Sequence, residues 1–175
     1  MKKNDPYSEY LEKNPSKATE FDTLDRIDRK ILNALQDNNQ ITNLELAEKV
    51  GISPPPCFRR VKRLRELCII TKDVSLVDPI KIGQNLIVFV SVTLEKQRED
   101  MMRYFERNML EQPEVKQCYF ISGEIDYLLV VHVKDMNDYN EFARRVFVKE
   151  ANIKSFRSSF CLSRVKYDTK VELVE

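Results

Sequence analysis

The sequence is short of the residues on which most enzyme sites depend. It has one histidine, His132, in an apolar stretch, which favours a structural role in a strand over a catalytic one. Its three glycines, Gly51, Gly83 and Gly123, lie at expected turns, and no GxSxG, Walker-type or metal-ligand spacing occurs. These absences argue against hydrolase, nucleotide-binding and metalloenzyme functions. They predict a protein that is not an enzyme and has no metal and no cofactor.

Paired cysteines and long apolar runs are also missing. Cys57, Cys68, Cys118 and Cys161 form no CxxC motif and have no histidine nearby. Three of them fall in apolar patterns, so we interpret them as reduced, buried thiols rather than zinc ligands or disulfides. No signal peptide and no apolar run of about 20 residues occurs, which predicts a cytoplasmic protein with no membrane partner.

Positive charge is scarce over the whole chain but concentrated in one stretch. The 175 residues carry 29 Lys and Arg against 28 Asp and Glu, a net charge of +1. Between residues 53 and 72, however, six basic residues accompany a single acidic residue, Glu66. Any affinity for nucleic acid must therefore come from this stretch.

The basic stretch has the period of an amphipathic helix. From residue 57 to 68 the apolar residues recur every three or four positions. At about 100° per residue, Arg59 and Arg63 point away from this apolar stripe. Arg60 and Lys62 flank it. An ordinary surface helix can show the same charge run, but such a guanidinium face also fits the major groove of duplex DNA.

Two further helices are predicted before the basic one. Residues 24–38 have an amphipathic pattern, with Asp25 and Asp28 in the first turn, where negative charge is favourable. Residues 43–50 follow a capping box at 42–45, and we expect Leu44, Ala47 and Val50 to share one buried face. Three helices in this order, the last one basic, favour DNA binding over a plain surface helix.

Gly51 ends the second helix, and the tight connection to the third is typical of a helix-turn-helix. The triple proline after Ser53 leaves the helix tip without backbone N–H groups, and regular helix is expected to begin nearer Pro56. We hypothesise that the Ser53 hydroxyl and the arginines contact phosphate instead. The predicted DNA-binding residues are Thr42, Asn43, Ser53, Arg59, Arg60, Lys62 and Arg63.

The second half of the chain has a β-α-β-β-α-β order, which is the ferredoxin-like pattern. Gly123-Glu124 is a two-residue hairpin signal between the second and third strands. Both faces of the central strands are apolar, so the face without helices is expected to meet a second copy of the chain. The expected elements are strand 86–94, helix 98–110, strands 115–122 and 125–134, helix 136–148 and strand 156–167.

The overall prediction is an α+β protein of two domains with flanking tails. Composition and turn signals place the boundaries. The predicted segments are a mobile N-terminal tail at 1–22, a helix-turn-helix domain at 23–68, an extended linker at 69–83, a ferredoxin-like domain at 84–168 and a C-terminal tail at 169–175.

Three stretches resemble the leucine-responsive (Lrp/AsnC) transcription regulators: Leu24 to Leu32, Ile52 to Cys57, and Ser122 to Leu129. The resemblance covers nearly everything after residue 22. It implies a winged-helix-like N-terminal domain and a C-terminal RAM domain, through which homodimers form and assemble into tetramers or octamers. The operator should be roughly palindromic. Residues 158–167 are similar to the branch that controls branched-chain amino-acid or proline catabolism.

The same resemblance singles out two further features. A glycine commonly follows the recognition helix in this family, whereas Cys68 stands there in this chain, and a non-glycine residue adopts a left-handed cap only at some cost. The 122–126 hairpin, which by itself could be an ordinary solubilising turn, lies near the family's effector site. The implied effector-binding residues are Ser122, Gly123, Glu124 and Asp126, with Asp126 facing the ammonium group of an amino acid.

These observations predict a cytoplasmic, nucleoid-associated regulator of amino-acid metabolism, bound to double-stranded DNA. Its effector is expected to be leucine or another branched-chain amino acid. Two alternatives remain open. One is a tetrapyrrole (sirohaem-type) decarboxylase of the same two-domain architecture, using His132, and the other is an amino-acid sensor that no longer binds DNA. The basic face at 59–63 argues against both.

Overall fold

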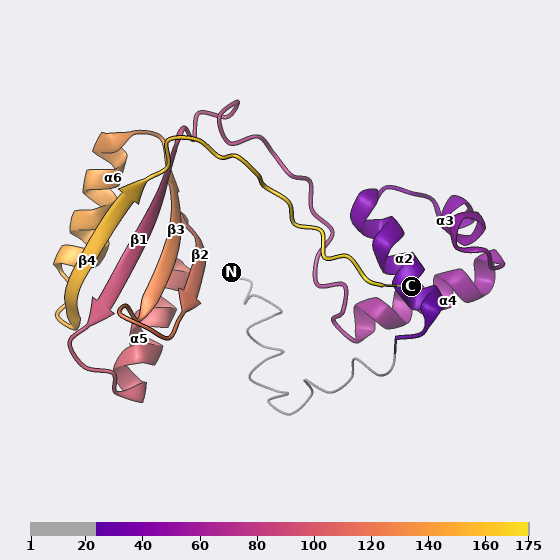
Figure 1. The fold of residues 1–175 in the computed structure, drawn as a ribbon, viewed down its shortest axis with the longest axis horizontal. Coiled ribbons are helices and arrows are strands. Elements are labelled where there is room, and N and C mark those ends of the chain that lie inside the picture. Colours follow the sequence, from indigo (N-terminus) through magenta and orange to yellow (C-terminus); the bar gives the residue numbers. More distant parts are fainter. Residues whose placement is uncertain (1–23, 175) are drawn as a thin grey trace. The chain divides into compact units, whose positions relative to one another are not determined.

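The computed structural model describes residues 24–174, which form two compact units (Figure 1). One unit combines the residues up to 75 with those from 167 onwards, and the other comprises residues 76–166. The predicted N-terminal tail lies outside the described residues. The C-terminal residues, predicted as a separate tail, are part of the first unit.

The described part of the first unit contains three helices: α2 (Arg26–Asp37), α3 (Asn43–Val50) and α4 (Pro54–Glu66). All three were predicted, although α4 begins at Pro54 rather than near Pro56. The core of the first unit brings together residues of all three helices. They are Ile31 and Ala34 of α2, Leu46, Ala47 and Val50 of α3, and Cys57, Val61 and Leu64 of α4. Leu44, expected inside, is 67% exposed and Leu46 takes its place.

Helices α3 and α4 both end in a Schellman motif, in which the N–H groups of two successive residues bond back to the last turn. After α3, Gly51 adopts a left-handed φ of 78° and Ile52 N donates to Ala47 O at 3.0 Å. After α4, Cys68 takes the same role with a φ of 55°, and Ile69 N donates to Leu64 O at 3.0 Å. Cys68 therefore does hold the position for which glycine is best suited.

The second unit is the predicted ferredoxin-like fold (Figure 1). Its sheet has the order β2-β3-β1-β4, and all three strand pairs are antiparallel. The elements are β1 (Leu86–Leu94), α5 (Glu99–Glu111), β2 (Val115–Phe120), β3 (Tyr127–Val133), α6 (Met136–Ala143), a π-helical turn (Arg144–Val148) and β4 (Ile153–Phe160).

Strand β4 and the β2–β3 connection differ from their predicted boundaries. Strand β4 starts at Ile153, not at 156, because Ile153 pairs with Leu94 of β1, and it ends at Phe160 rather than 167. The β2–β3 connection is longer than a two-residue hairpin. It spans residues 121–126 and is closed by the Ile121 N to Asp126 O hydrogen bond of 2.9 Å.

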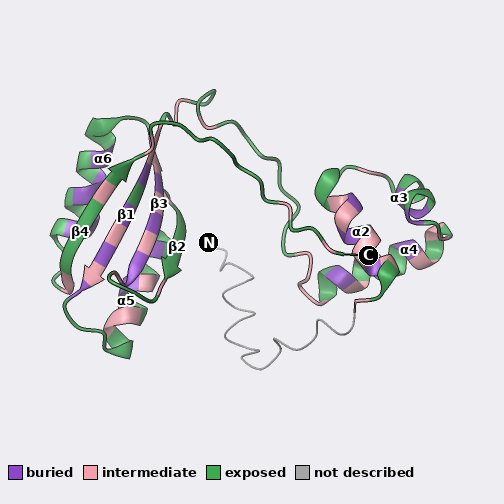
Figure 2. Ribbon diagram, in the orientation of Figure 1, coloured by how far each residue is buried: buried purple, intermediate pink, exposed green. Residues whose placement is uncertain are grey.

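The sheet has one buried and one open face. Alternate residues of β1 and β3 are buried beneath the helices, as the striped colouring of both strands in Figure 2 shows. Val90 and Leu129 are cross-strand partners on this face and are 0% exposed. On the other face Phe89, paired with Val130, is 40% exposed. The predicted two-sided apolar sheet is therefore present.

The cysteines are free thiols, but only Cys57 is buried. Burial raises the pKa of the Cys57 thiol. The expectation of several buried cysteines is wrong, because Cys68 and Cys161 are half-buried at the ends of α4 and β4. Among residues 24–174, no helix is long and apolar enough to cross a membrane.

Candidate nucleic-acid interface and effector site

A buried carboxylate connects the first helix to the basic helix. Asp28 of α2 is 0% exposed, and both of its oxygens accept hydrogen bonds from arginines of α4. Arg60 Nη1 donates to Oδ1 at 2.9 Å, and Arg63 donates to Oδ2. The prediction that Arg63 points away from the core is wrong in this respect, because its guanidinium turns back to Asp28.

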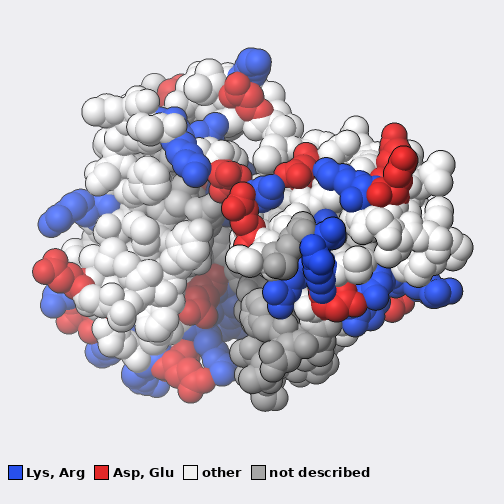
Figure 3. Space-filling view, turned by 45° about the vertical axis from the view of Figure 1, so that its right-hand side comes forward, with Lys and Arg blue, Asp and Glu red and all other residues white. Residues whose placement is uncertain are grey.

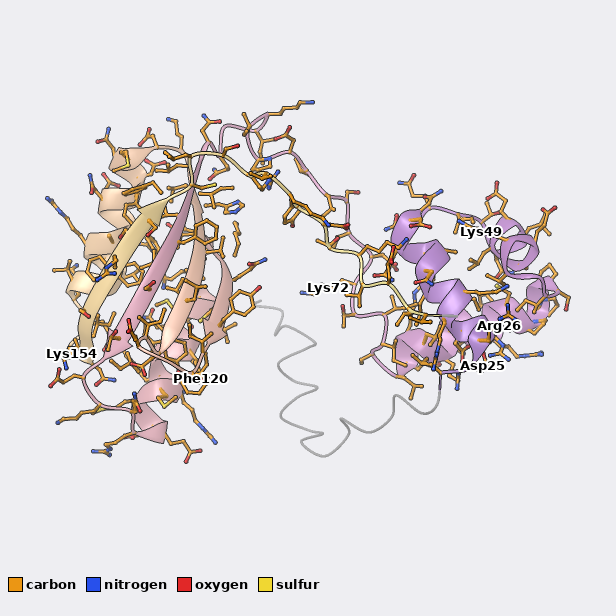
Figure 4. The ribbon with its side chains drawn as sticks, viewed as in Figure 1. Asp25, Arg26, Lys49, Lys72, Phe120 and Lys154 are labelled. Carbon is orange, nitrogen blue, oxygen red and sulfur yellow. The ribbon has the colours of Figure 1, made fainter. Side chains whose placement is uncertain are left out.

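Asp25 extends this cluster to the start of α2, where it is labelled in Figure 4. It is the N-cap and forms a capping box with Asp28, and it accepts a second bond from Arg60 Nη1 at 2.6 Å. Burial opposes ionisation of Asp25, but the Asp28 N–H and the Arg60 guanidinium outweigh it and lower its pKa. Hydrogen bonds to Asp28 and Asp25 raise the pKa of Arg60.

Because Arg60 and Arg63 bond to Asp28, the side chains that α4 presents to solvent are not the four basic residues predicted from the sequence. Arg59 and Lys62 are exposed, and the Lys62 ammonium lies 3.7 Å from Glu66. Ser53 precedes the helix and makes no side-chain cap bond, as the three prolines predict. Phe58, which sequence reasoning missed, is 60% exposed beside Arg59. The sequence did indicate this exposure, because Phe58 lies outside the three- and four-residue spacing of the apolar residues that form the core.

Thr42 and Asn43, the DNA contacts predicted at the start of α3, also form hydrogen bonds within the protein. The Thr42 hydroxyl donates to Glu45 Oε2 at 2.7 Å, which lowers the pKa of Glu45, and the predicted capping box is present. Asn43 Nδ2 donates to Pro54 O at 3.0 Å and so ties α3 to the first turn of α4. Both residues therefore set the geometry of the turn between the helices.

Charges of both signs are interspersed on the surface. In the view of Figure 3, Lys and Arg side chains stand beside Asp and Glu side chains. In the first unit, Arg65 pairs with Asp73 at 2.9 Å. The positive stripe on α4 is therefore local and short, comprising Arg59 and Lys62, with Arg65 one turn further on.

The predicted effector residues lie at one end of the sheet, in the 121–126 loop. Ser122, Gly123 and Glu124 are exposed. Gly123 has a φ of 141°, which residues with a side chain rarely adopt, and open space surrounds it. The loop can therefore bring backbone N–H groups close to a small ligand.

Asp126, in contrast, is only 6% exposed and already has partners. Its Oδ2 accepts a hydrogen bond from the N–H of Leu94 at 2.7 Å, and its Oδ1 accepts one from Nε2 of Gln97 at 2.6 Å. The carboxylate thus connects the β2–β3 loop to the loop that follows β1. Gln97 lies 29 positions away in the sequence, and no sequence pattern pointed to it.

A cavity of about 680 Å³ lies at the other end of strand β3, next to His132. None of the predicted effector residues lines it. Its walls include Lys116, Glu114 and Arg145, and Arg145 donates to Glu114 Oε1 at 2.5 Å. The second oxygen of Glu114 is buried and has no hydrogen-bond partner among the described residues.

A helix-turn-helix whose second helix exposes basic side chains, together with a ferredoxin-like unit, defines a DNA-binding transcription regulator with an added ligand-binding domain. Residues 24–67 match the winged helix-turn-helix DNA-binding model, and residues 87–171 match the Lrp/AsnC ligand binding domain. The chain belongs to the Lrp/AsnC family of transcription regulators. No strand accompanies α2, α3 and α4 between residues 24 and 75.

The chain is 44% identical over 143 residues to an HTH-type transcriptional regulator of Sinorhizobium fredii, covering 82% of this chain and 85% of that protein. It is 34% identical over 148 residues to the leucine-responsive regulatory protein of Escherichia coli, covering 85% and 90%. Neither name is that of an enzyme. The branch concerned with amino-acid catabolism stays a prediction.

Two solved structures are similar in fold. An AsnC family regulator from Agrobacterium tumefaciens is 37% identical, with a TM-score of 0.80. A Neisseria meningitidis transcriptional regulator in complex with L-Met is 34% identical, with a TM-score of 0.79. Each match covers 85% of this chain and 96% of the other.

Proposed function

We propose that the protein binds operator DNA through α4, and that Arg59, Lys62 and Ser53 supply the direct contacts. The exposed stripe of α4 carries this proposal, because its side chains are free of the Asp28 cluster and follow one another along one helix face. Arg60 and Arg63 then act mainly by fixing α4 against α2. Thr42 and Asn43 act at the turn, where a phosphate can reach their side chains.

The decisive experiment is DNA binding to the gene's own upstream region at two salt concentrations. Sequence-preferring, salt-sensitive binding supports the regulator, since each phosphate contact adds about one unit to the salt slope. Binding that shows no preference between the upstream region and unrelated DNA would contradict the proposal. A coloured purified protein with a Soret-type band would instead favour the tetrapyrrole decarboxylase.

We further propose that the effector is an amino acid, taken up at the 121–126 loop. The L-Met complex of the Neisseria meningitidis relative supports this class of ligand. The ammonium group would replace Gln97 Nε2 on Asp126 Oδ1, while Oδ2 keeps its bond to Leu94. Ser122, Glu124 and the backbone beside Gly123 would then surround the rest of the ligand. Leucine or another branched-chain amino acid remains the expected effector.

The cavity beside Glu114 is the alternative effector site, favoured by its unpartnered carboxylate oxygen. The operator titration is therefore repeated with leucine, valine, proline, lysine and methionine, and with two variants. If the loop is the site, Gln97→Ala changes the response to the effective amino acid and Glu114→Gln does not. The reverse result assigns the effector to the cavity.

Assembly follows from the open sheet face. We propose that two copies pair through the face that exposes Phe89, because a second apolar sheet is the economical cover for it. Such a dimer presents two α4 helices to a roughly palindromic operator and can associate further into tetramers or octamers. A protein whose target is chromosomal DNA acts in the cytoplasm, on the nucleoid.

A further inference from the structure

The last residues of the chain lie along helix α2 in an extended conformation (Figure 1). The side chain of Asn33 bonds to both backbone groups of Leu173: Nδ2 donates to the carbonyl at 2.8 Å, and the N–H donates to Oδ1 at 3.1 Å. One helical turn away, Gln36 makes the same pair of bonds with Val171, at 2.9 and 2.8 Å.

The spacing of these bonds fits a helix face to an extended peptide. Successive residues of an extended segment point to opposite sides, so alternate residues such as 171 and 173 face the same surface. Positions 33 and 36 lie on one side of a helix. An amide side chain carries one donor group and one acceptor, so each can satisfy both peptide groups of the residue opposite.

Three more contacts fix the position of the segment along the helix. Arg29 Nη1 donates to Val174 O at 3.0 Å, and the Lys170 ammonium lies 2.7 Å from Asp37 Oδ1. The hydrogen bond from Lys170 lowers the pKa of Asp37. The Leu173 side chain packs against the core of the first unit. The segment is therefore held by backbone, charge and apolar contacts at once.

We propose that the outer face of α2 is a docking site for an extended peptide, and that its occupant is the chain's own C-terminal segment, residues 170–174. Docking makes a second tether between the two units. Residues 68–85 are the first, and residues 161–169, which follow β4 and are exposed from 162 onwards, become the second. Because this tether is anchored at both ends, a change in the ligand-binding unit alters the freedom of the DNA-binding unit.

Two features of the chain after β4 are relevant to the proposed tether. The ligand-binding family match ends at residue 171, so the anchoring residue Leu173 lies beyond it. Residues 161–169 contain no helix or strand, and Leu162 and Val165 are 99% and 95% exposed. After the hydrogen bond from Cys161 N to Ile87 O at 2.9 Å, the chain therefore runs to Lys170 without regular secondary structure.

The first test is amide hydrogen exchange of the full-length protein. We expect the amides of Val171 and Leu173 to be protected at least tenfold more than that of Glu172, which lies between them. The double substitution Asn33→Ala/Gln36→Ala should remove this protection, whereas Gln40→Ala, at an exposed amide beyond α2, should leave it. Equal exchange at 171, 172 and 173 in the parent, or protection that survives the double substitution, would overturn the docking.

A concentration series identifies the occupant. Protection independent of protein concentration supports the chain's own segment, and protection lost on dilution would assign the site to the segment of a second copy and overturn the intrachain tether. Should the double variant fail to fold, Leu173→Asp replaces it, with Glu172→Ala as the matched control.

The second test rests on the proposed function. In the double variant, operator binding without effector should stay within about threefold of the parent, while the amino-acid response should fall at least threefold. An unchanged response in a variant that has lost its protection would overturn the tether role. A parent that binds no operator would sink the proposed function instead, and the exchange pattern would still decide the docking.

Discussion

The carboxylate of Asp28 and the guanidinium of Arg63 are hydrogen-bonded across 35 positions of sequence. The aspartate is fully buried, whereas the arginine side chain is 42% exposed. Asp28, together with Asp25 at the N-cap of α2, thus fixes the basic helix to α2. These two carboxylates divide the arginines of α4 into those that hold the helix and those left for a partner.

Replacing Asp28 by Asn should destabilise the first unit by roughly 2–4 kcal/mol, since it leaves two arginines without their buried counter-charge. This loss extends below the roughly 3–5 kcal/mol typical of breaking a buried ion pair, because both guanidiniums reach solvent. Urea unfolding, followed by a probe in this unit, measures the loss. Asp73→Asn, which breaks the exposed pair with Arg65, is the control and should cost less than about 1 kcal/mol. Equal losses in the two variants would contradict the central position of Asp28.

Arg59→Ala should weaken operator binding and reduce the salt slope by about one unit, because one phosphate contact is lost. The unfolding free energy should be unchanged, as Arg59 is exposed. Arg63→Ala should show the opposite pattern, with lower stability and a smaller direct effect on the slope. Binding titrations at several salt concentrations, each paired with an unfolding curve, distinguish the two. An intact slope in Arg59→Ala would remove this residue from the interface.

Phe58 should recognise thymine through its methyl group, since an apolar side chain on a major-groove helix can contact that methyl. An operator with deoxyuridine in place of thymine should bind the parent protein more weakly by about 1 kcal/mol, the value of one methyl group. Phe58→Ala should bind both operators alike. Leu44→Ala, at an exposed apolar residue of α3, serves as the control and should keep the discrimination.

Cys68→Gly should raise the stability of the first unit by roughly 0.5–1 kcal/mol, because glycine adopts the left-handed cap without steric cost. The gain stays small since glycine also has more freedom in the unfolded chain. Cys68→Ala keeps the strained conformation and removes only the thiol, so it should show no gain. Thermal melting of the three proteins checks the order. A loss in Cys68→Gly would mean that the thiol's packing outweighs the backbone term.

His132 should make the second unit less stable in mild acid. Burial, with Lys116 and Arg164 nearby, lowers the pKa of His132. Its neutral form is therefore favoured in the folded state, so the unfolded chain binds the proton more readily. The contribution of His132 to stability is complete above the unfolded pKa, about 6.5, and is lost as the pH falls through the lower folded value.

Melting curves at pH 7.5 and 5.5 test this, and His132→Gln should reduce the difference between them. The chain contains no other histidine, so His132 is the only histidine that can contribute to the change. A difference of the same size in the variant would assign the effect to other groups.

Local patterns allowed most of the fold to be predicted. Helix caps depend on residues three or four apart, and the capping box at Thr42 and the left-handed Gly51 were both readable. Leu44 was misplaced because two positions turn a helix by about 200°, so that Leu46 faces the core and Leu44 faces solvent. Strand β4 was placed late because Ile153 gains its strand conformation only by pairing with Leu94.

Long-range contacts decided the rest of the candidate sites, and these leave no trace in local spacing. The partners of Asp28, the bond from Gln97 to Asp126 and the docking of Leu173 on Asn33 join residues 29 to 140 positions apart. The arginines of α4 were recognised as one charged run. Only the packing of α2 against α4 assigns Arg60 and Arg63 a different task from Arg59.

The three consecutive prolines at the start of α4 also limit how the interface can be observed. Because proline has no N–H, residues 54–56 contribute no signal to amide-detected spectra, and the backbone reports on this helix only from Cys57 onward. The helix tip is thus spectroscopically silent where it would approach DNA. A fluorinated ring at Phe58 would supply the missing reporter there.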